Sequence, residues 1–301
     1  METIYIKNKK FNKLPDEICA AIGNFDGVHI GHQQLVKECK KHNLKSGVIT
    51  FYPHPSIFLK KIPNYPLLTP IEEKKKVFES LGIDYLIIIE FNNDMALMPK
   101  EEFIKCLKEL NIKSLVAGYD FTFGKMAEGD IRDLADNFIF YEVKKYIYDG
   151  IRVSTTYIRE LLDSGNIIET NKLLGRHYSI SGIVEYGNQK GRLIGFPTAN
   201  IDYKNYFLPK GGVYSVSVSL NGKTYKGICN IGNNPTINYS LVKKLEVHII
   251  DLDENIYGQE LKINFIERIR EEMKFSSAKE LIEQLEKDKC YVLDRENSKN
   301  I

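Results

Sequence analysis

Two histidines that could take part in chemistry, His29 and His32, lie in a glycine-rich stretch directly after a short apolar run. The apolar run Ile18–Ile22 predicts a buried strand, and the apolar spacing from about Gly31 onward predicts a helix. A strand, a glycine-rich turn and a helix start form a phosphate-binding arrangement, because free N–H groups and the positive helix end face the turn. Two imidazoles placed there can donate hydrogen bonds to phosphoryl oxygens and stabilise charge that develops during transfer. We therefore predict a phosphate site with these histidines as its catalytic residues.

The sequence His29-Ile30-Gly31-His32 resembles the HxGH signature of the nucleotidyltransferase superfamily. An isolated pair of histidines is a weak motif, so this hypothesis needs partners further along the chain. The same turn supplies the other candidates for ATP and phosphate binding, which are Gly23, Phe25, Asp26, Gly27 and Gly31.

One partner is the start of a predicted helix, where Ser154 and Thr155 are followed one turn later by Arg159. These residues suit the outer phosphates of a triphosphate, since a helix N-terminus attracts anions and arginine binds phosphate. The alternative is an ordinary N-cap with a surface arginine. His54, in the loop Pro53-His54-Pro55, lies between the two motifs, and we assign it no role.

A further stretch, Gly118–Lys125, follows a predicted strand and contains an acid and two phenylalanines. Asp120, Phe121 and Phe123 are candidates for a pocket that holds a flat ring. Burial in the hydrophobic core is the alternative, and it is the commoner fate of phenylalanine. The stretch is not a P-loop, because five residues separate its glycines and Met126 stands where Ser or Thr is required.

The C-terminal half contains a glycine-rich run that could fold over phosphates. Its candidate residues are Gly187, Lys190, Gly191, Gly195, Thr198 and Asn200. Thr198 and Asn200 also provide the hard oxygen donors that magnesium accepts. A hairpin loop followed by a strand is the alternative. Glu246, in an alternating strand, could accept a proton from a hydroxyl group, while His248 shares its face and could be structural.

Strands alternate with helices in the first half, which predicts a mainly parallel sheet with helices on both faces. The predicted strands are Ile18–Ile22, Gly47–Phe51, Tyr85–Glu90, Ser114–Gly118 and Phe138–Val143, after an edge strand within Met1–Lys13. Thr69–Glu72 has the pattern of a capping box with Pro70 at the first helical position, and Pro99 begins a second helix. Ligands of such folds bind at the carboxyl ends of the strands, where the two histidines are expected.

After Gly175 short alternating strands dominate, which predicts a small antiparallel barrel. These strands are Tyr178–Tyr186, Val213–Leu220, Lys223–Ile228, Leu245–Asp251 and Leu261–Ile269. Asn221-Gly222 is a type I′ hairpin signal, and a capping box at Ser277–Glu280 begins a final helix. The expected fold class is therefore α/β, with a Rossmann-like nucleotidyltransferase domain over residues 1–172 and a β-barrel domain with a C-terminal helix over residues 173–301.

Composition excludes several classes of protein. With 301 residues, 43% hydrophobic and 27% charged, the chain is typical of a globular protein with two cores. A net charge of +2 gives no general attraction for nucleic acid. The five scattered cysteines argue against a disulfide framework, and no apolar run could span a bilayer or serve as a signal peptide. We expect a cytoplasmic protein, a monomer or weak homo-oligomer, that binds neither nucleic acid nor membranes.

The motifs of both halves, taken in order, resemble the bacterial bifunctional riboflavin kinase/FMN adenylyltransferase family, also called FAD synthetase. The first half matches at Gly23–His32, Thr50–Pro55, Gly118–Gly124 and Ser154–Arg159. The second half matches at Gly175–Arg176, Gly191–Asn200, Gly212–Tyr214, Asn230–Thr236, Glu246–His248 and Arg270–Phe275. The family often has serine in place of Thr155 and arginine in place of Thr122, so the substrate contact of Thr122 is left open.

This resemblance implies two reactions. The barrel would transfer the γ-phosphoryl group of ATP to the ribityl 5′-hydroxyl of riboflavin, with Glu246 as general base and Thr198 and Asn200 holding Mg²⁺ and phosphates. The N-terminal domain would join the resulting FMN to the α-phosphorus of a second ATP and release pyrophosphate. The residues implied to bind flavin in the kinase half are Arg270, Glu272 and Phe275.

Two alternatives belong to other classes. An HxGH adenylyltransferase for another acceptor, such as a pantetheine or nicotinamide phosphate, would use the barrel as an accessory domain, and the run Gly191–Asn200 argues against this. A flavin-binding regulator without turnover would have lost catalytic positions, whereas His29, His32, Asn200 and Glu246 are all present.

Overall fold

The computed structural model describes residues 1–187, 190–234 and 242–294, without the side chains of Lys190, Leu193, Asn233, Asn234 and Val242. Contacts within the chain divide it into two compact units, Met1–Tyr157 and Ile158–Ile301, and each unit is described by itself. The domain boundary at residue 172 stays a prediction. Among the helices of the described ranges, none is long and apolar enough to cross a membrane.

The first unit is built on a parallel sheet with strand order β1-β4-β3-β2-β5-β6. Its strands are β1 (Glu2–Ile6), β2 (Ile18–Ile22), β3 (Lys45–Tyr52), β4 (Tyr85–Glu90), β5 (Ile112–Gly118) and β6 (Ile139–Val143). These confirm the predicted parallel sheet and its edge strand. From β2 the chain continues to one side of the sheet and returns to β5 on the other side of β2. The carboxyl ends of β2 and β5 therefore form the switch point at which such sheets bind ligands.

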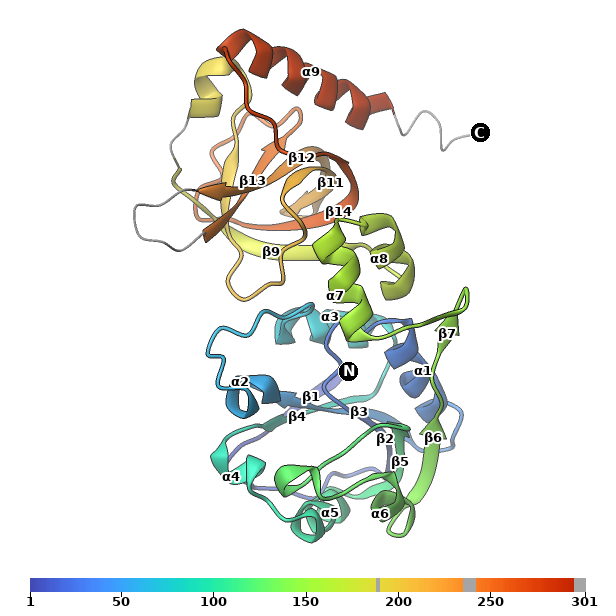
Figure 1. Ribbon diagram of the computed structural model, residues 1–301. Helices are drawn as coiled ribbons and strands as arrows, with labels where there is room; N and C mark the ends of the chain where they lie inside the picture. Colours follow the sequence, from blue (N-terminus) through green and yellow to red (C-terminus); the bar gives the residue numbers. More distant parts are fainter. Residues whose placement is uncertain (188–189, 235–241, 295–301) are drawn as a thin grey trace. The chain divides into compact units, whose positions relative to one another are not determined.

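Helices cover both faces of this sheet (Figure 1). One face packs against α1 (Ile30–Cys39) and α3 (Ile71–Ser80), and the other against α4 (Asn93–Ala96), α5 (Lys100–Glu109) and α6 (Ile131–Ala135). Every residue of β2 is buried between the two layers, which explains its unbroken apolar sequence. A short α2 (Pro55–Leu59) and a hairpin of β7 (Ile147–Tyr148) and β8 (Ile151–Arg152) complete the unit. The sequence analysis did not predict the hairpin, although Asp149-Gly150 is a turn signal.

The start of α3 differs from the prediction. The helix begins at Ile71 and its N-cap is Pro70, which makes no side-chain cap hydrogen bond, so the predicted capping box does not form. The reason is a tertiary contact, because the Asp26 carboxylate accepts the backbone N–H groups of Leu68 at 2.9 Å and Thr69 at 3.2 Å. These contacts fix the chain just before the helix.

The second unit contains a closed antiparallel barrel of order β10-β13-β12-β11-β14-β9, which confirms the predicted barrel. Two helices precede it, α7 (Thr155–Ser164), whose first residues up to Tyr157 belong to the first unit, and α8 (Ile167–Leu174). Its strands are β9 (Tyr178–Glu185), β10 (Ala199–Asp202), β11 (Gly212–Leu220), β12 (Lys223–Asn234), β13 (Val242–Ile249) and β14 (Glu260–Arg270). Asn221 and Gly222 have φ of 49° and 77°, which confirms the type I′ turn. The short β10 was not predicted.

The last helix of the described chain, α9 (Ala278–Asp294), begins where the sequence predicts it. Ser277 Oγ accepts the Glu280 N–H at 3.2 Å, whereas the Glu280 carboxylate bonds to Ser276. The predicted capping box is therefore only half formed. Inside the barrel Val216, Val247 and Phe265 are fully buried, so side chains fill its interior.

Candidate active sites

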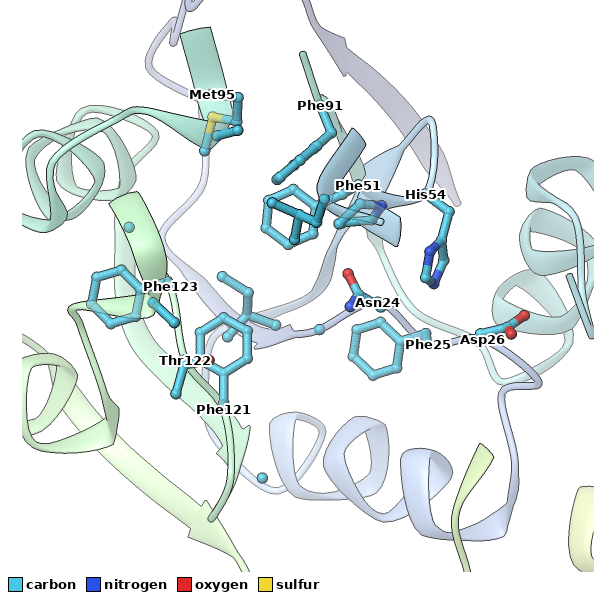
Figure 2. A pocket seen from close by; sticks show the side chains of 18 of the residues that line it. Asn24, Phe25, Asp26, Phe51, His54, Phe91, Met95, Phe121, Thr122 and Phe123 are labelled. Carbon is cyan, nitrogen blue, oxygen red and sulfur yellow. The ribbon is translucent and has the colours of Figure 1, made fainter. Parts of the chain in front are cut away.

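A cavity of about 650 Å³ lies at the carboxyl ends of the central strands in the first unit. Figure 2 shows the rings of Phe51 and Phe91 on one side of it and those of Phe25 and Phe121 on the other. None of its described lining residues is a lysine or arginine. The cavity therefore suits a large flat aromatic group, while any attached anion needs N–H groups and imidazoles at the rim.

The two predicted histidines stack on each other, with ring centroids 3.5 Å apart and planes 14° apart. His29 is the buried N-cap of α1, and its Nδ1 accepts the backbone N–H of His32 at 3.1 Å. An accepting nitrogen carries no proton, so neutral His29 holds its proton on Nε2, which becomes the donor. A Cβ at Gly31 would lie 3.1 Å from His29 Nδ1, so glycine lets the ring sit against the backbone. His32 itself lines the cavity.

The loop between β2 and α1 has an unusual backbone. Phe25, Gly27 and Val28 have φ of 50°, 91° and 42°, in the left-handed region that only glycine adopts readily. The loop is held by the buried Asp26, whose carboxylate binds the segment before α3 and whose carbonyl accepts the Thr155 hydroxyl at 2.9 Å. Non-glycine residues in this region are strained by about 1–3 kcal/mol each and cluster at functional sites.

The predicted helix cap forms at the start of α7. Ser154 Oγ accepts the N–H of Tyr157 at 3.2 Å. Thr155 lines the cavity, and its hydroxyl donates to the backbone carbonyl of Asp26. Arg159 belongs to the second unit, where its guanidinium lies 4.8 Å from the ring centre of Phe207. The structure thus brings Ser154 and Thr155 to the loop of the histidines, and a phosphate contact by Arg159 stays a prediction.

The residues predicted to hold a flat ring all line the cavity, together with Thr122. Phe121 and Phe123 lie 6.0 Å apart with nearly parallel planes, and Phe123 is also part of the hydrophobic core. Asp120 accepts a hydrogen bond from Arg152 Nη2 at 2.8 Å in an exposed ion pair. Both interpretations of the phenylalanines therefore hold, since the same rings belong to the core and face the cavity.

Sequence reasoning missed several lining residues. His54, to which we assigned no role, is buried in the wall, stacks on Tyr65 and accepts the Ser56 N–H on Nδ1 at 3.2 Å. Asn24 and Phe91 also line the cavity. Their signal in the sequence is their position directly after a predicted strand, because the carboxyl ends of parallel strands converge on one edge.

On the barrel, the predicted residues lie on the outer face. Asn200 of β10 is directly opposite Glu246 of β13 and Glu185 of β9, and Glu246 is opposite Asn230 of β12. Opposite residues of antiparallel strands project to the same face. Because the adjacent Val247 is buried inside, this polar row lies outside the barrel. Glu185 and Asn230 are additional members that the sequence reasoning did not single out.

Gly187, at the start of the glycine-rich run, packs tightly against this row. A Cβ at Gly187 would lie 2.0 Å from Asn200 Nδ2, so only glycine allows the chain to approach that amide. Gly191 accepts the Phe196 N–H at 2.9 Å, and Gly195 has a φ of 81°. The segment from Gly191 to Phe196 therefore folds back on itself, and Gly187 lies beside Asn200. Residues 188–189 and the Lys190 side chain lie outside the described parts, as do Pro235 and Thr236 of the matched motif.

A second cavity, of about 130 Å³, is lined by Thr198 and Arg192 and by the loop Asp253–Tyr257. The ring of Tyr257 stacks on Tyr186 with centroids 4.0 Å apart. Among the described residues there is no cluster of three or more His, Cys, Asp or Glu that could hold a metal. A cation here would need oxygens from Thr198, phosphates and water.

Two residues of the barrel that were predicted to bind flavin lie against other parts of the protein. Arg270 forms a bidentate pair with the buried Asp288 of α9, at 3.1 Å from Nε and 2.7 Å from Nη2. Glu272 lies close to the polar row, because a Cβ at Gly232 would be 2.5 Å from Glu272 Oε1 and 3.2 Å from Asn230 Nδ2. Their contacts with flavin stay predictions.

His248 and Phe275 complete the predicted set. His248 Nδ1 lies 2.9 Å from the Pro197 carbonyl, and since a carbonyl only accepts, His248 donates. Burial lowers the pKa of His248, which favours the neutral imidazole with its proton on Nδ1. The structural role considered for His248 therefore fits, because it fixes the segment just before Thr198. Phe275 is half-buried after β14.

The comparisons with known proteins agree with this geometry. Residues 11–157 match the family model of FAD synthetase, and residues 174–294 match that of riboflavin kinase. The fold and sites thus define a two-domain class of flavin nucleotide transferases.

Known relatives span the same two halves. The chain is 40% identical over 283 residues to the bifunctional riboflavin kinase/FMN adenylyltransferase of Bacillus subtilis, covering 89% of each chain. Its identity to the Escherichia coli K12 protein of the same name is 35% over 290 residues, covering 92% of each. This protein belongs to the bifunctional riboflavin kinase/FMN adenylyltransferase family. The resemblance stated from the motifs is confirmed.

A solved structure from Streptococcus pneumoniae, described as a macrolide-efflux protein, is similar over nearly the whole chain. The TM-score is 0.90 with 32% identity, covering 98% of this chain and 99% of that one. The activity in that description belongs to that protein, and we take only the shared fold from it.

Proposed function

We propose that the barrel phosphorylates riboflavin with ATP to give FMN, and that the first unit adenylylates FMN to give FAD and pyrophosphate. Membership of a family with both activities supports this division. The observation that carries the assignment of the first unit is the stacked pair His29–His32 at the start of α1. The second ring of this pair lines an aromatic cavity of about 650 Å³.

In the adenylylation step, a phosphate oxygen of FMN attacks the α-phosphorus of ATP. The bond from this phosphorus to the oxygen bridging to the β-phosphorus breaks, and pyrophosphate leaves with that oxygen. His29 and His32 donate hydrogen bonds to oxygens whose negative charge grows, and the positive end of α1 adds to this stabilisation. Positioning of two bound substrates suffices, so no covalent enzyme intermediate is needed.

The remaining residues of the first unit bind the two substrates. Phe121, Phe123 and Asp120 contact the flavin, whose rings fill the aromatic cavity. The backbone of the glycine-rich turn, namely Gly23, Phe25, Asp26, Gly27 and Gly31, surrounds the phosphates of ATP. Ser154 and Thr155, at the start of α7, bind the outer phosphates. Arg159, further along the same helix, is expected from the resemblance to contact these phosphates.

In the kinase step, the Glu246 carboxylate accepts the proton of the riboflavin 5′-hydroxyl as its oxygen bonds to the γ-phosphorus. The bond to the β–γ bridging oxygen breaks, and ADP leaves. Gly187, Gly191 and Gly195 let the backbone approach the phosphates. Lys190 also contacts the phosphates, and the riboflavin contacts are Arg270, Glu272 and Phe275.

The donor set beside Glu246 fits magnesium. Thr198 is exposed at the second cavity. The Asn200 amide occupies space beside Gly187 that a Cβ at residue 187 would fill. These two residues would hold Mg²⁺ together with phosphate oxygens. When bound, Mg²⁺ neutralises charge on the transferred phosphoryl group.

The direct test is to incubate the protein with riboflavin, ATP and Mg²⁺ and to separate the flavins by chromatography. We expect FMN first and FAD later, and the absence of both would refute the proposal. Replacing Mg²⁺ by excess chelator should stop FMN formation. We also infer a cytoplasmic enzyme, because its cysteines form no disulfides, and we expect a monomer or weak homo-oligomer.

A further inference from the structure

A buried lysine lies behind the loop that carries the histidines. Lys74 of α3 is 3% exposed, and its ammonium group donates to the Asn24 carbonyl at 2.6 Å. The Thr50 hydroxyl donates to the same carbonyl at 3.3 Å. Burial lowers the pKa of Lys74 to about 8, and the field of Asp26 opposes this effect. A buried ammonium is expensive, and an apolar side chain could fill the space without that cost.

The position of the carbonyl determines where the adjoining N–H points. The peptide between Asn24 and Phe25 is trans, and in a trans peptide the C=O and N–H bonds point in opposite directions. Since the Asn24 carbonyl is directed at Lys74, the Phe25 N–H is directed away from Lys74. Asn24 and Phe25 line the cavity, whereas Lys74 does not. Within the described chain, no group accepts a hydrogen bond from the Phe25 N–H.

We propose that Lys74 is a positioning residue for adenylyl transfer, which holds the Asn24–Phe25 peptide so that the Phe25 N–H donates to a phosphoryl oxygen of ATP. This inference rests on the assignment of the cavity to FMN adenylylation. The ammonium stabilises Phe25 at its φ of 50°, a conformation that an unsupported loop would leave. It also polarises the peptide, because hydrogen bonds in a chain strengthen one another.

The charge of Lys74 adds to the attraction for phosphate. The described cavity wall contains no lysine or arginine, and its only charged side chains are those of Asp26 and Asp120. The buried ammonium group of Lys74 is separated from the cavity by the Asn24–Phe25 peptide, and its positive charge offsets part of this negative field. Lys74 thus supplies positive charge to the phosphate site without contacting the substrate.

The test compares Lys74→Met with Lys75→Met. Methionine keeps an unbranched side chain as far as the ε-carbon but removes the ammonium group, and with it the charge and the donor. Lys75 is the matched control, because it lies on the same helix but forms only surface contacts, an ion pair with Glu72 and a cation–π contact with Tyr5. FAD formation from added FMN and ATP gives kcat and KM, and riboflavin phosphorylation is measured on the same preparations.

We expect Lys74→Met to lower kcat for FAD formation roughly 10- to 100-fold, as for loss of a charged hydrogen bond. Riboflavin phosphorylation should stay unchanged, and Lys75→Met should match the wild type in both reactions. If kcat for FAD formation is the same in Lys74→Met and Lys75→Met, Lys74 has no positioning role. If the wild type makes no FAD, the proposed function itself fails.

A structural role would give different results. Amide hydrogen exchange of β2 and β3 reports whether the first unit is folded, and exchange at the rate of an unfolded chain in Lys74→Met would overturn the proposal. Lys74→Ala provides a second test, because propylammonium replaces the atoms that this variant lacks. We expect propylammonium to restore FAD formation, whereas an equal concentration of tetramethylammonium, which has no N–H donor, should not. Equal rates with the two salts would contradict positioning by a hydrogen bond.

Discussion

The two candidate active sites use different parts of their folds. In the first unit the site is a cavity at the carboxyl ends of parallel strands, whereas in the second unit the polar row of Glu185, Asn200, Glu246 and Asn230 lies outside a closed barrel. The cause is topology. An open parallel sheet leaves a crevice at its switch point, but a small barrel fills its interior with side chains, so only its outer face and loops can bind substrates.

The two sites also differ in the chemical groups that they offer to a substrate. The cavity of the first unit offers aromatic surface and the imidazole of His32, while the barrel site offers carboxylates, amides and a glycine-rich run. We therefore expect each site to lose its own reaction when changed and to leave the other reaction intact.

The largest effect is expected from Glu246→Gln. The amide cannot accept the proton of the riboflavin hydroxyl, so FMN formation should fall about 10²- to 10⁴-fold. FAD formation from added FMN should stay within about twofold of the wild type, since the first unit is unchanged. Steady-state kinetics of both reactions check this, and a normal kinase rate would exclude Glu246 as general base.

His32→Ala should have the reverse effect. Loss of one of the stacked imidazoles should reduce FAD formation about 10²- to 10³-fold, the range for removal of one donor to transition-state charge. FMN should then accumulate from riboflavin. The matched variant on the barrel, Asn200→Ala, should strongly reduce FMN formation, by less than Glu246→Gln does, while added FMN still becomes FAD. If either variant stops both reactions in folded protein, the two sites are not independent.

The next prediction concerns pH and stability. The pKa of Lys74 is lowered from 10.5 to about 8, so between these values the unfolded chain binds more protons than the folded one. The free energy of unfolding of the wild type, relative to Lys74→Met, should therefore rise with pH across this window. The gain is about 3 kcal/mol when complete, at the usual conversion for a change in pKa. Urea unfolding of both proteins at several pH values measures it, and parallel curves would contradict a lowered pKa of the buried Lys74.

The smallest effect is expected from Phe121→Ala. Removal of one ring should raise KM for FMN in adenylylation by roughly tenfold, because an aromatic contact and its buried area are lost. The barrel counterpart is Phe275→Ala, which should raise KM for riboflavin and leave KM for FMN unchanged. Exchange of these two results would reverse the assignment of the flavin sites.

Local patterns in the sequence predicted much of the fold. The unbroken apolar run Ile18–Ile22, the proline before α5 and the turn Asn221-Gly222 each follow from interactions among near neighbours. The HxGH motif likewise predicted a strand, a turn and a helix start at the correct residues. Chain segments that depend on distant partners were predicted less well. The short β10 forms because it pairs with β9 and β13, and the start of α3 depends on Asp26.

The sequence by itself determined which side chains could perform chemistry and on which elements they lie. Only the tertiary structure decided that His54 and Phe91 belong to the wall of the cavity, that Arg270 pairs with Asp288, and that the buried Lys74 holds the loop of the histidines. The physical reason is that spacing along the chain reports local geometry, whereas burial and hydrogen-bond partners arise from residues that folding brings together.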